Sequence, residues 1–115
     1  MKVIIAGGRD FADYNLLCIK CDIFLANQEE VEIVSGQANG ADKLGEQYAK
    51  EKGYPIKIFS PEWRTYGKGA GHITNKKMAE YSNALIAFWD GNSKGTKHMI
   101  DTATNTGLIV EVVNY

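Results

Sequence analysis

The chain has 115 residues, 44% of them hydrophobic, with 13 basic and 14 acidic side chains and a formal net charge of −1. This length and composition predict one globular domain spanning residues 1–115, with a core that needs no metal or disulfide support. The near balance of charges argues against a dedicated nucleic-acid-binding protein, and no segment is long and apolar enough to cross a membrane.

Short apolar runs alternate with stretches of helical periodicity along the chain. The runs predict strands at residues 2–6, 31–34, 56–59, 84–89 and 108–113. The periodic stretches predict helices at residues 13–27, 41–52, 73–83 and 95–106, with a longer loop at residues 60–71. This alternation is typical of a three-layer, Rossmann-like α/β fold, in which a five-stranded parallel sheet carries helices on both faces.

Individual residues support these boundaries. Asp13 is expected to cap the first helix, and Gly53 and Gly107 are expected to end the second and fourth helices. Because a strand begins at Lys2, we see no signal peptide and expect a cytoplasmic location.

The two cysteines, Cys18 and Cys21, have the C-x-x-C spacing of redox and zinc motifs. A redox cysteine needs a helix N-terminus, but both cysteines fall in the middle of the predicted first helix. A zinc site needs two more ligands, for which only His72 and His98 exist. Packing of Cys21 in the core is the favoured interpretation, and we expect neither a metal nor a cofactor.

Four glycine-bearing loops are placed where a helix should begin, at residues 7–10, 35–42, 66–71 and 90–96. In a parallel sheet such loops lie at one edge, where the free N–H groups of helix N-termini favour anions. The expected switch point between the first and fourth strands would bring residues 7–10 and 90–96 side by side. Together the loops predict one composite pocket for a phosphate-bearing ligand.

The first loop combines backbone freedom with a cation. Gly7 and Gly8 allow a ligand to approach the backbone, and Arg9, one of two arginines in the chain, can hold a phosphate through two hydrogen bonds. The alternative interpretation is a surface Arg9 that pairs with Asp10 and closes a tight turn.

The last loop offers the hydroxyls of Ser93 and Thr96 at a helix N-terminus opened by Gly95, with Asp90 at the start of the loop. It is not a P-loop, because the Walker lysine–hydroxyl pair is absent. A capped helix start needs no ligand, but capping and anion binding use the same groups, so the two interpretations are compatible.

The second loop begins with Ser35 and Gly36, and Gly36 exposes backbone N–H groups. Asn39 is expected to cap the second helix, which places Asp42 in the first turn. Two interpretations of Asp42 stay open: a carboxylate that the helix dipole stabilises, or an acceptor for ribose hydroxyls.

The loop before the third helix places Trp63 and Tyr66 beside glycines that end at Gly71. Such rings suit stacking on a base, and they equally suit packing of a long loop against the sheet. Asn75, on the first turn of the third helix, is expected at the same edge as His72. His98 is expected in solvent, on the outer face of the last helix.

The order of these motifs resembles the SLOG superfamily of Rossmann-like proteins, and within it the small stand-alone branch related to YspA. The residues that carry the resemblance are Gly7–Phe11, Ser35–Asp42, Ala70–Asn75 and Asp90–Thr96. The resemblance covers nearly the whole chain. It implies a nucleotide or nucleotide-derived ligand and a homo-oligomer.

Two positions depart from the patterns of that superfamily. Its LOG phosphoribohydrolases carry a catalytic glutamate where this chain has Met99, and its stand-alone branch often has an arginine where this chain has Thr74. Arg64 or Lys68 would have to replace that missing cation. The missing glutamate favours binding over hydrolysis.

We therefore predict a binding or sensing module for a nucleotide-like small molecule. Phosphate is assigned to Arg9, Ser93, Thr96 and the glycine N–H groups, ribose to Asp42 or Asp90, and the base to Trp63 or Tyr66. The full set of predicted ligand-binding residues is Gly7, Gly8, Arg9, Ser35, Gly36, Asn39, Asp42, Gly71, Asn75, Asp90, Ser93, Gly95 and Thr96.

Two alternatives belong to other functional classes. An N-glycosidase would use Asp10, Asp42 or Asp90 beside an oxocarbenium-like transition state, with Asp10 and Asp42 as the leading candidates. Binding of single-stranded nucleic acid, by analogy with the DprA proteins of the same superfamily, is disfavoured by the near-neutral net charge.

Overall fold

The computed structural model describes all residues from Met1 to Tyr115. Five parallel strands form one sheet in the order β3-β2-β1-β4-β5. The strands are β1 (Lys2–Gly7), β2 (Glu32–Ser35), β3 (Ile56–Ile58), β4 (Ala84–Trp89) and β5 (Ile109–Asn114). The helices are α1 (Tyr14–Phe24), α2 (Ala41–Lys52), α3 (Trp63–Tyr66), the 3₁₀ turn η1 (Gly67–Gly69), α4 (Ala70–Tyr81) and α5 (Lys94–Thr106).

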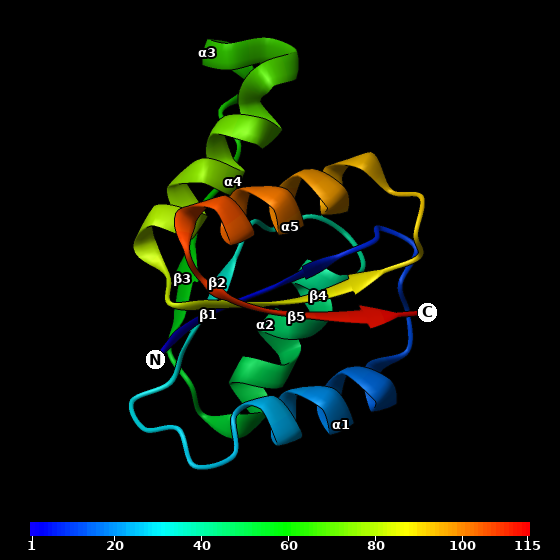
Figure 1. The fold of residues 1–115 in the computed structure, drawn as a ribbon, viewed down its shortest axis with the longest axis vertical. Coiled ribbons are helices and arrows are strands. Elements are labelled where there is room, and N and C mark those ends of the chain that lie inside the picture. Colours follow the sequence, from blue (N-terminus) through cyan, green and yellow to red (C-terminus); the bar gives the residue numbers. More distant parts are fainter.

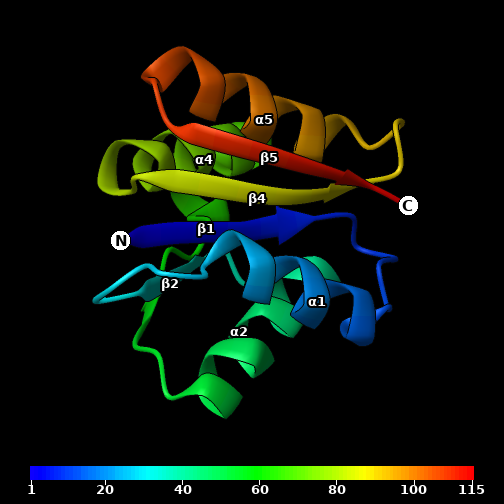
Figure 2. The ribbon, with the colours of Figure 1, turned by 60° about the horizontal axis from the view of Figure 1, so that its bottom comes forward.

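Helices cover both faces of the sheet, with α1 and α2 on one side and α4 and α5 on the other (Figures 1 and 2). The side chains of β1 alternate between the two layers: Val3 and Ile5 join the core beneath α1 and α2, while Ile4 and Ala6 join the core beneath α4 and α5. The predicted three-layer α/β fold with a five-stranded parallel sheet is confirmed. None of its helices has the length and apolar character needed to span a membrane.

The central strands are apolar on both faces because both faces are covered. Residues 3–6 of β1 and residues 84–88 of β4 are buried, and Val3 pairs with Ile33 of β2 and with Ala84 of β4. This arrangement places the carboxyl ends of β1, β2 and β4 together at one edge of the sheet.

The first helix is shorter than predicted. Asp13 caps it as expected, because its side chain accepts a hydrogen bond from the N–H of Leu16 at 3.0 Å. The helix ends at Phe24 and not at residue 27, since Asn27 adopts a left-handed conformation with φ of 67°.

The start of α2 differs from the prediction in its cap. Gly40 occupies the N-cap position and no side chain caps the helix, so the expected cap at Asn39 is wrong. The predicted stop signals are confirmed, because Gly53 and Gly107 both take the left-handed conformation at the ends of α2 and α5.

The predicted loop at residues 60–71 is largely helical. It contains α3, η1 and the first residues of α4, which begins at Ala70 rather than at residue 73. Of the glycines in this segment, only Gly67 has a positive φ, whereas Gly69 is helical. A glycine in a helix costs only about 1 kcal/mol relative to alanine, so glycines alone are a weak signal against a helix.

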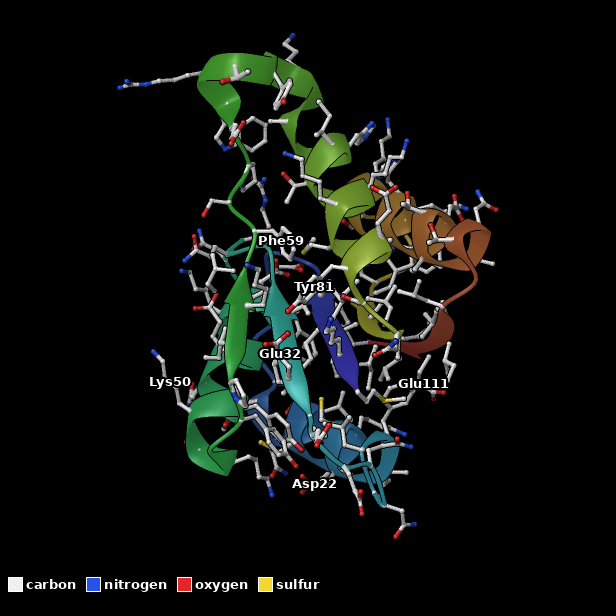
Figure 3. The ribbon with its side chains drawn as sticks, turned by 90° about the vertical axis from the view of Figure 1, so that its left-hand side faces the viewer. Asp22, Glu32, Lys50, Phe59, Tyr81 and Glu111 are labelled. Carbon is white, nitrogen blue, oxygen red and sulfur yellow. The ribbon has the colours of Figure 1, made fainter.

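The C-terminal half of α4 is anchored on the sheet by Tyr81. Its hydroxyl donates a hydrogen bond to the carboxylate of Glu32 on β2, and its ring meets Phe59 edge-on with centroids 5.4 Å apart (Figure 3). The N-terminal half of α4, with α3 and η1, projects beyond the sheet (Figures 1 and 3).

Candidate functional site

The loops that follow β1 and β2 pack directly against each other. The N–H of Ala41 donates to the carbonyl oxygen of Gly8 at 3.2 Å. A Cβ atom on Gly40 would lie 2.2 Å from that same oxygen, and Gly40 has φ of +79°. Only glycine permits both the conformation and the close approach, so this residue sets how tightly the two loops pack.

The loop after β1 is also tied to β4. The N–H of Gly8 donates to the carbonyl oxygen of Phe88 at 3.0 Å, and a Cβ atom on Gly7 would lie 2.2 Å from that oxygen. Residues of the three loops after β1, β2 and β4 line one shared cleft, together with residues of α3, α4 and α5.

The cleft has a volume of about 170 Å³ and opens to solvent. Most of the predicted ligand-binding residues line it, namely Gly7, Arg9, Gly36, Asp42, Gly71, Asn75, Ser93, Gly95 and Thr96. Residues from the loops after β1 and β4 lie together in its lining, as the expected switch point requires. Whether these residues contact a ligand stays a prediction.

Four of the predicted residues lie outside the cleft lining: Gly8, Ser35, Asn39 and Asp90. Ser35 is buried, and its hydroxyl donates to Glu46 at 2.7 Å and accepts from the N–H of Gln37 at 3.1 Å. Asp90 accepts hydrogen bonds from the N–H groups of Asn92 and Ser93, both at 2.8 Å, and these bonds lower the pKa of its carboxyl group. Ser35 and Asp90 therefore shape the loops.

Asp10 also lies outside the cleft, and it does not pair with Arg9. Its carboxylate accepts a hydrogen bond from the hydroxyl of Tyr115 at 2.6 Å. The ion pairs of the structure are Lys52–Asp22 and Lys97–Asp101, so the alternative of an Arg9–Asp10 pair is wrong. Arg9 belongs to the cleft lining, and its guanidinium has no carboxylate partner.

Ser93 begins α5 at the mouth of the cleft. Its Oγ accepts a hydrogen bond from the N–H of Thr96 at 3.4 Å and lies 3.0 Å from the hydroxyl of Thr96. The N–H groups of Lys94 and Gly95 have no acceptor, as expected at a helix N-terminus. This end of α5 thus offers free donors and a positive dipole end to the cleft.

Asp42 is the buried carboxyl group of the cleft, with 5% of its surface exposed. Burial raises its pKa to about 7, the neighbouring charge of Glu46 acts in the same direction, and hydrogen bonds from backbone N–H groups, that of Ala38 foremost, oppose the shift. Near neutral pH the side chain can both accept and donate a hydrogen bond.

His98 is not the solvated residue that the sequence suggested. Its ring stacks on that of His72, with centroids 3.7 Å apart and an interplanar angle of 8°, and its Nδ1 accepts a hydrogen bond from the Asn75 amide at 3.0 Å. Burial and the charge of His72 lower the pKa of His98. The packing of α5 on α4 thus fixes Asn75 in the cleft wall.

Other lining residues carried no clear sequence signal. Met78 and Met99 reach the cleft although their helical periodicity marks them only as core residues, and Met99 is 2% exposed. The hydroxyl of Thr74 donates to the carbonyl oxygen of Ala70 at 2.8 Å. Further lining residues are Ala6, Ala38, Pro61, Trp63 and His72.

Trp63 and Tyr66 differ in their relation to the cleft. Trp63 lines it and is 53% exposed, whereas Tyr66 lies outside the lining, is 42% exposed, and has the Nζ of Lys77 at 5.7 Å from its ring centroid. Trp63 is thus the better placed of the two for contact with a base in the cleft.

These features define a Rossmann-like α/β protein with a solvent-accessible cleft at the carboxyl edge of its sheet. The family model described as "YAcAr: YspA, cpYpsA-related SLOG family" matches residues 1–66, and the chain belongs to this family. The match includes the loops after β1 and β2. Membership indicates a nucleotide-related binding or modifying role. No curated protein and no solved structure matches the chain.

Proposed function

We propose that this protein binds a nucleotide or nucleotide-derived phosphoribosyl ligand in the cleft and acts as a binding or sensing module. The observation that carries the proposal is the convergence of two independent anion-binding features on one cleft. They are the unpaired guanidinium of Arg9 and the open N-terminus of α5 at Ser93. Family membership supports a ligand of this class.

The dimensions of the cleft suggest how such a ligand is held. A volume of about 170 Å³ is below the roughly 300–1,000 Å³ of pockets that enclose a whole small-molecule ligand. We assign the phosphate to Arg9 and the N-terminus of α5. The ribose is assigned to Asp42 rather than to Asp90, because Asp90 lies outside the cleft lining. The base then lies at the mouth of the cleft against Trp63 rather than Tyr66, which also lies outside the lining.

The test compares nucleotides with their nucleosides in the Arg9→Ala variant. A hydrogen bond to a charged group contributes about 1.5–3 kcal/mol, so calorimetry should show nucleotide affinity falling roughly ten- to a hundredfold while nucleoside affinity stays nearly unchanged. Lys50→Ala, at an exposed site outside the cleft, is the control and should leave both affinities unchanged. An equal loss for nucleotide and nucleoside would contradict the phosphate role.

One observation favours a second candidate, an N-glycosidase that cleaves a base from its ribose. A carboxyl group buried in the cleft with a pKa of about 7, that of Asp42, suits general acid catalysis at neutral pH. Met99 opposes this candidate, because it puts an apolar side chain in the cleft where LOG-type enzymes carry glutamate.

Chromatography of nucleotides incubated with the protein separates the two candidates. We expect little or no release of free base, and mass spectrometry of the natively purified protein should detect an intact nucleotide-like ligand. Rapid release of base that disappears in Asp42→Asn would establish the glycosidase instead.

A further inference from the structure

The segment from Trp63 to Lys77 holds the largest group of basic residues in the chain that no acidic residue interrupts. It contains four basic residues (Arg64, Lys68, Lys76 and Lys77) and no acidic residue. The rest of the chain has nine basic and 14 acidic residues. We call residues 63–77 the basic arm.

The basic arm stands apart from the sheet. Figure 1 shows α3 and the start of α4 at one end of the longest dimension of the molecule, which is 38 Å. Figure 3 shows the same projection from the side, with Lys50 and Asp22 toward the opposite end. The arm thus presents its charges to solvent.

The four cations of the arm are exposed and have no acidic partner. The ion pairs of the structure join Lys52 to Asp22 and Lys97 to Asp101, and neither pair lies in the arm. Like charges gathered on one projection repel one another, and binding of an anionic ligand would relieve this repulsion. A ligand with a single phosphate, held at Arg9, leaves these four cations unused.

The arm is also continuous with the cleft. Trp63 and Gly71 belong to both, and the ring of Trp63 lies 3.9 Å from the position of a Cβ atom on Gly71. Beyond Trp63, the half-exposed ring of Tyr66 is the next aromatic surface along the arm. Exposed aromatic rings interleaved with cations are the features that bind successive bases and phosphates of a nucleotide chain.

We propose, resting on the function proposed above, that the ligand is a dinucleotide. Its first phosphoribosyl unit occupies the cleft, and its second phosphate and second base lie on the basic arm. Arg64 and Lys68 contact the second phosphate, and the rings of Trp63 and Tyr66 stack on the bases. A longer nucleic acid does not fit as well, because the surface outside the arm is net acidic.

The test measures binding of the four 5′-phosphorylated homodinucleotides and of the matching mononucleotides by calorimetry. Three proteins are compared: the native chain, the double variant Arg64→Gln with Lys68→Gln, and the control Lys20→Gln with Lys50→Gln. The control removes the same charge from exposed lysines of α1 and α2, outside the arm. All variants are checked for native circular dichroism.

We expect at least one dinucleotide to bind the native chain ten or more times more tightly than its mononucleotide. The arm variant should lose most of that advantage and keep its mononucleotide affinity, and the control should keep both. Equal affinity for mono- and dinucleotide would overturn the inference and leave the proposed function standing.

Absence of binding by every nucleotide would overturn the proposed function and this inference with it. A ten-residue single strand that binds the native chain still more tightly than any dinucleotide, and loses that affinity in the arm variant, would assign the arm to nucleic acid and also overturn the inference.

Discussion

Burial of a single carboxyl group, that of Asp42, makes the floor of the cleft sensitive to pH near neutrality. The group is held by the backbone of the loop after β2, chiefly through the N–H of Ala38 at 3.3 Å. Its pKa of about 7 in the folded chain compares with about 3.9 in an unfolded chain. The folded protein therefore binds a proton that the unfolded chain has already released.

This difference predicts a stability change in the variant Asp42→Asn. Protonated Asp42 contributes to the free energy of unfolding, and this contribution is complete below about pH 4. It is lost as the pH rises through about 7, by at most about 1.4 kcal/mol per pH unit. Urea unfolding between pH 4.5 and 8 should show this slope in the native chain and a much smaller one in Asp42→Asn.

The exposed residue Glu111 supplies the control. Glu111→Gln should retain the pH dependence of the native chain. If Asp42→Asn and the native chain have the same slope, the raised pKa of Asp42 is contradicted.

The N-terminus of α5 is the element on which the proposed phosphate site depends. Ser93 caps this helix, and replacement of such a cap by alanine costs about 1 kcal/mol. Ser93→Ala should lower the free energy of unfolding by this amount and should also weaken nucleotide binding. This variant alone cannot separate the cap from the ligand contact.

A second variant, Ser93→Asp, separates the two roles. Aspartate caps a helix as well as serine does, but its negative charge repels a phosphate at the same place. We expect near-native stability in urea unfolding together with loss of nucleotide affinity in calorimetry. Normal nucleotide binding by Ser93→Asp would show that the phosphate is held elsewhere.

The contact between the loops after β1 and β2 depends on Gly40. Gly53 has the left-handed helical conformation (φ +75°, ψ 24°) with no atom near the position of a Cβ, whereas Gly40 (φ +79°, ψ −126°) has a conformation that residues with a side chain rarely adopt, and a Cβ atom there would clash. Gly53→Ala should cost about 1 kcal/mol for the left-handed conformation alone. Gly40→Ala should cost clearly more in thermal unfolding, and equal losses would contradict the close packing of the two loops.

At the scale of the whole molecule, the sheet order brings the end of β5 back to the loop after β1. Tyr115 donates to Asp10, which lies 105 positions earlier, and its ring meets that of Phe11 edge-on at 4.8 Å. The carboxylate of Asp10 is thus bound by Tyr115, and Arg9 has no carboxylate partner. Tyr115 itself lies outside the cleft lining.

Tyr115→Phe keeps the ring and removes this hydrogen bond. We expect a loss of about 1 kcal/mol in stability, faster hydrogen exchange at the amides of Gly8 and Phe11, and weaker nucleotide binding as Asp10 turns to Arg9. Tyr14→Phe, which removes a similar bond to Glu51 elsewhere in the molecule, should cost similar stability and leave nucleotide binding unchanged.

The sequence by itself determined the α/β class, the order of the strands and helices along the chain, and the glycine stops at Gly53 and Gly107. These features follow from the spacing of apolar residues and from local backbone preferences, both of which depend only on residues close together in the sequence. Local information failed at residues 60–71, where the glycines suggested a loop and the structure has helices, because the cost of a glycine in a helix is small.

Only the tertiary structure decided which side chains reach the cleft. In the folded chain His98 stacks on His72, and Asp10 accepts a hydrogen bond from Tyr115. Arg9 has no carboxylate partner. The tertiary structure also buried Asp42 and placed Met99 in the cleft wall. Each outcome depends on residues far apart in the chain, and their distances are set by helix packing and strand order, which no local pattern of residues contains.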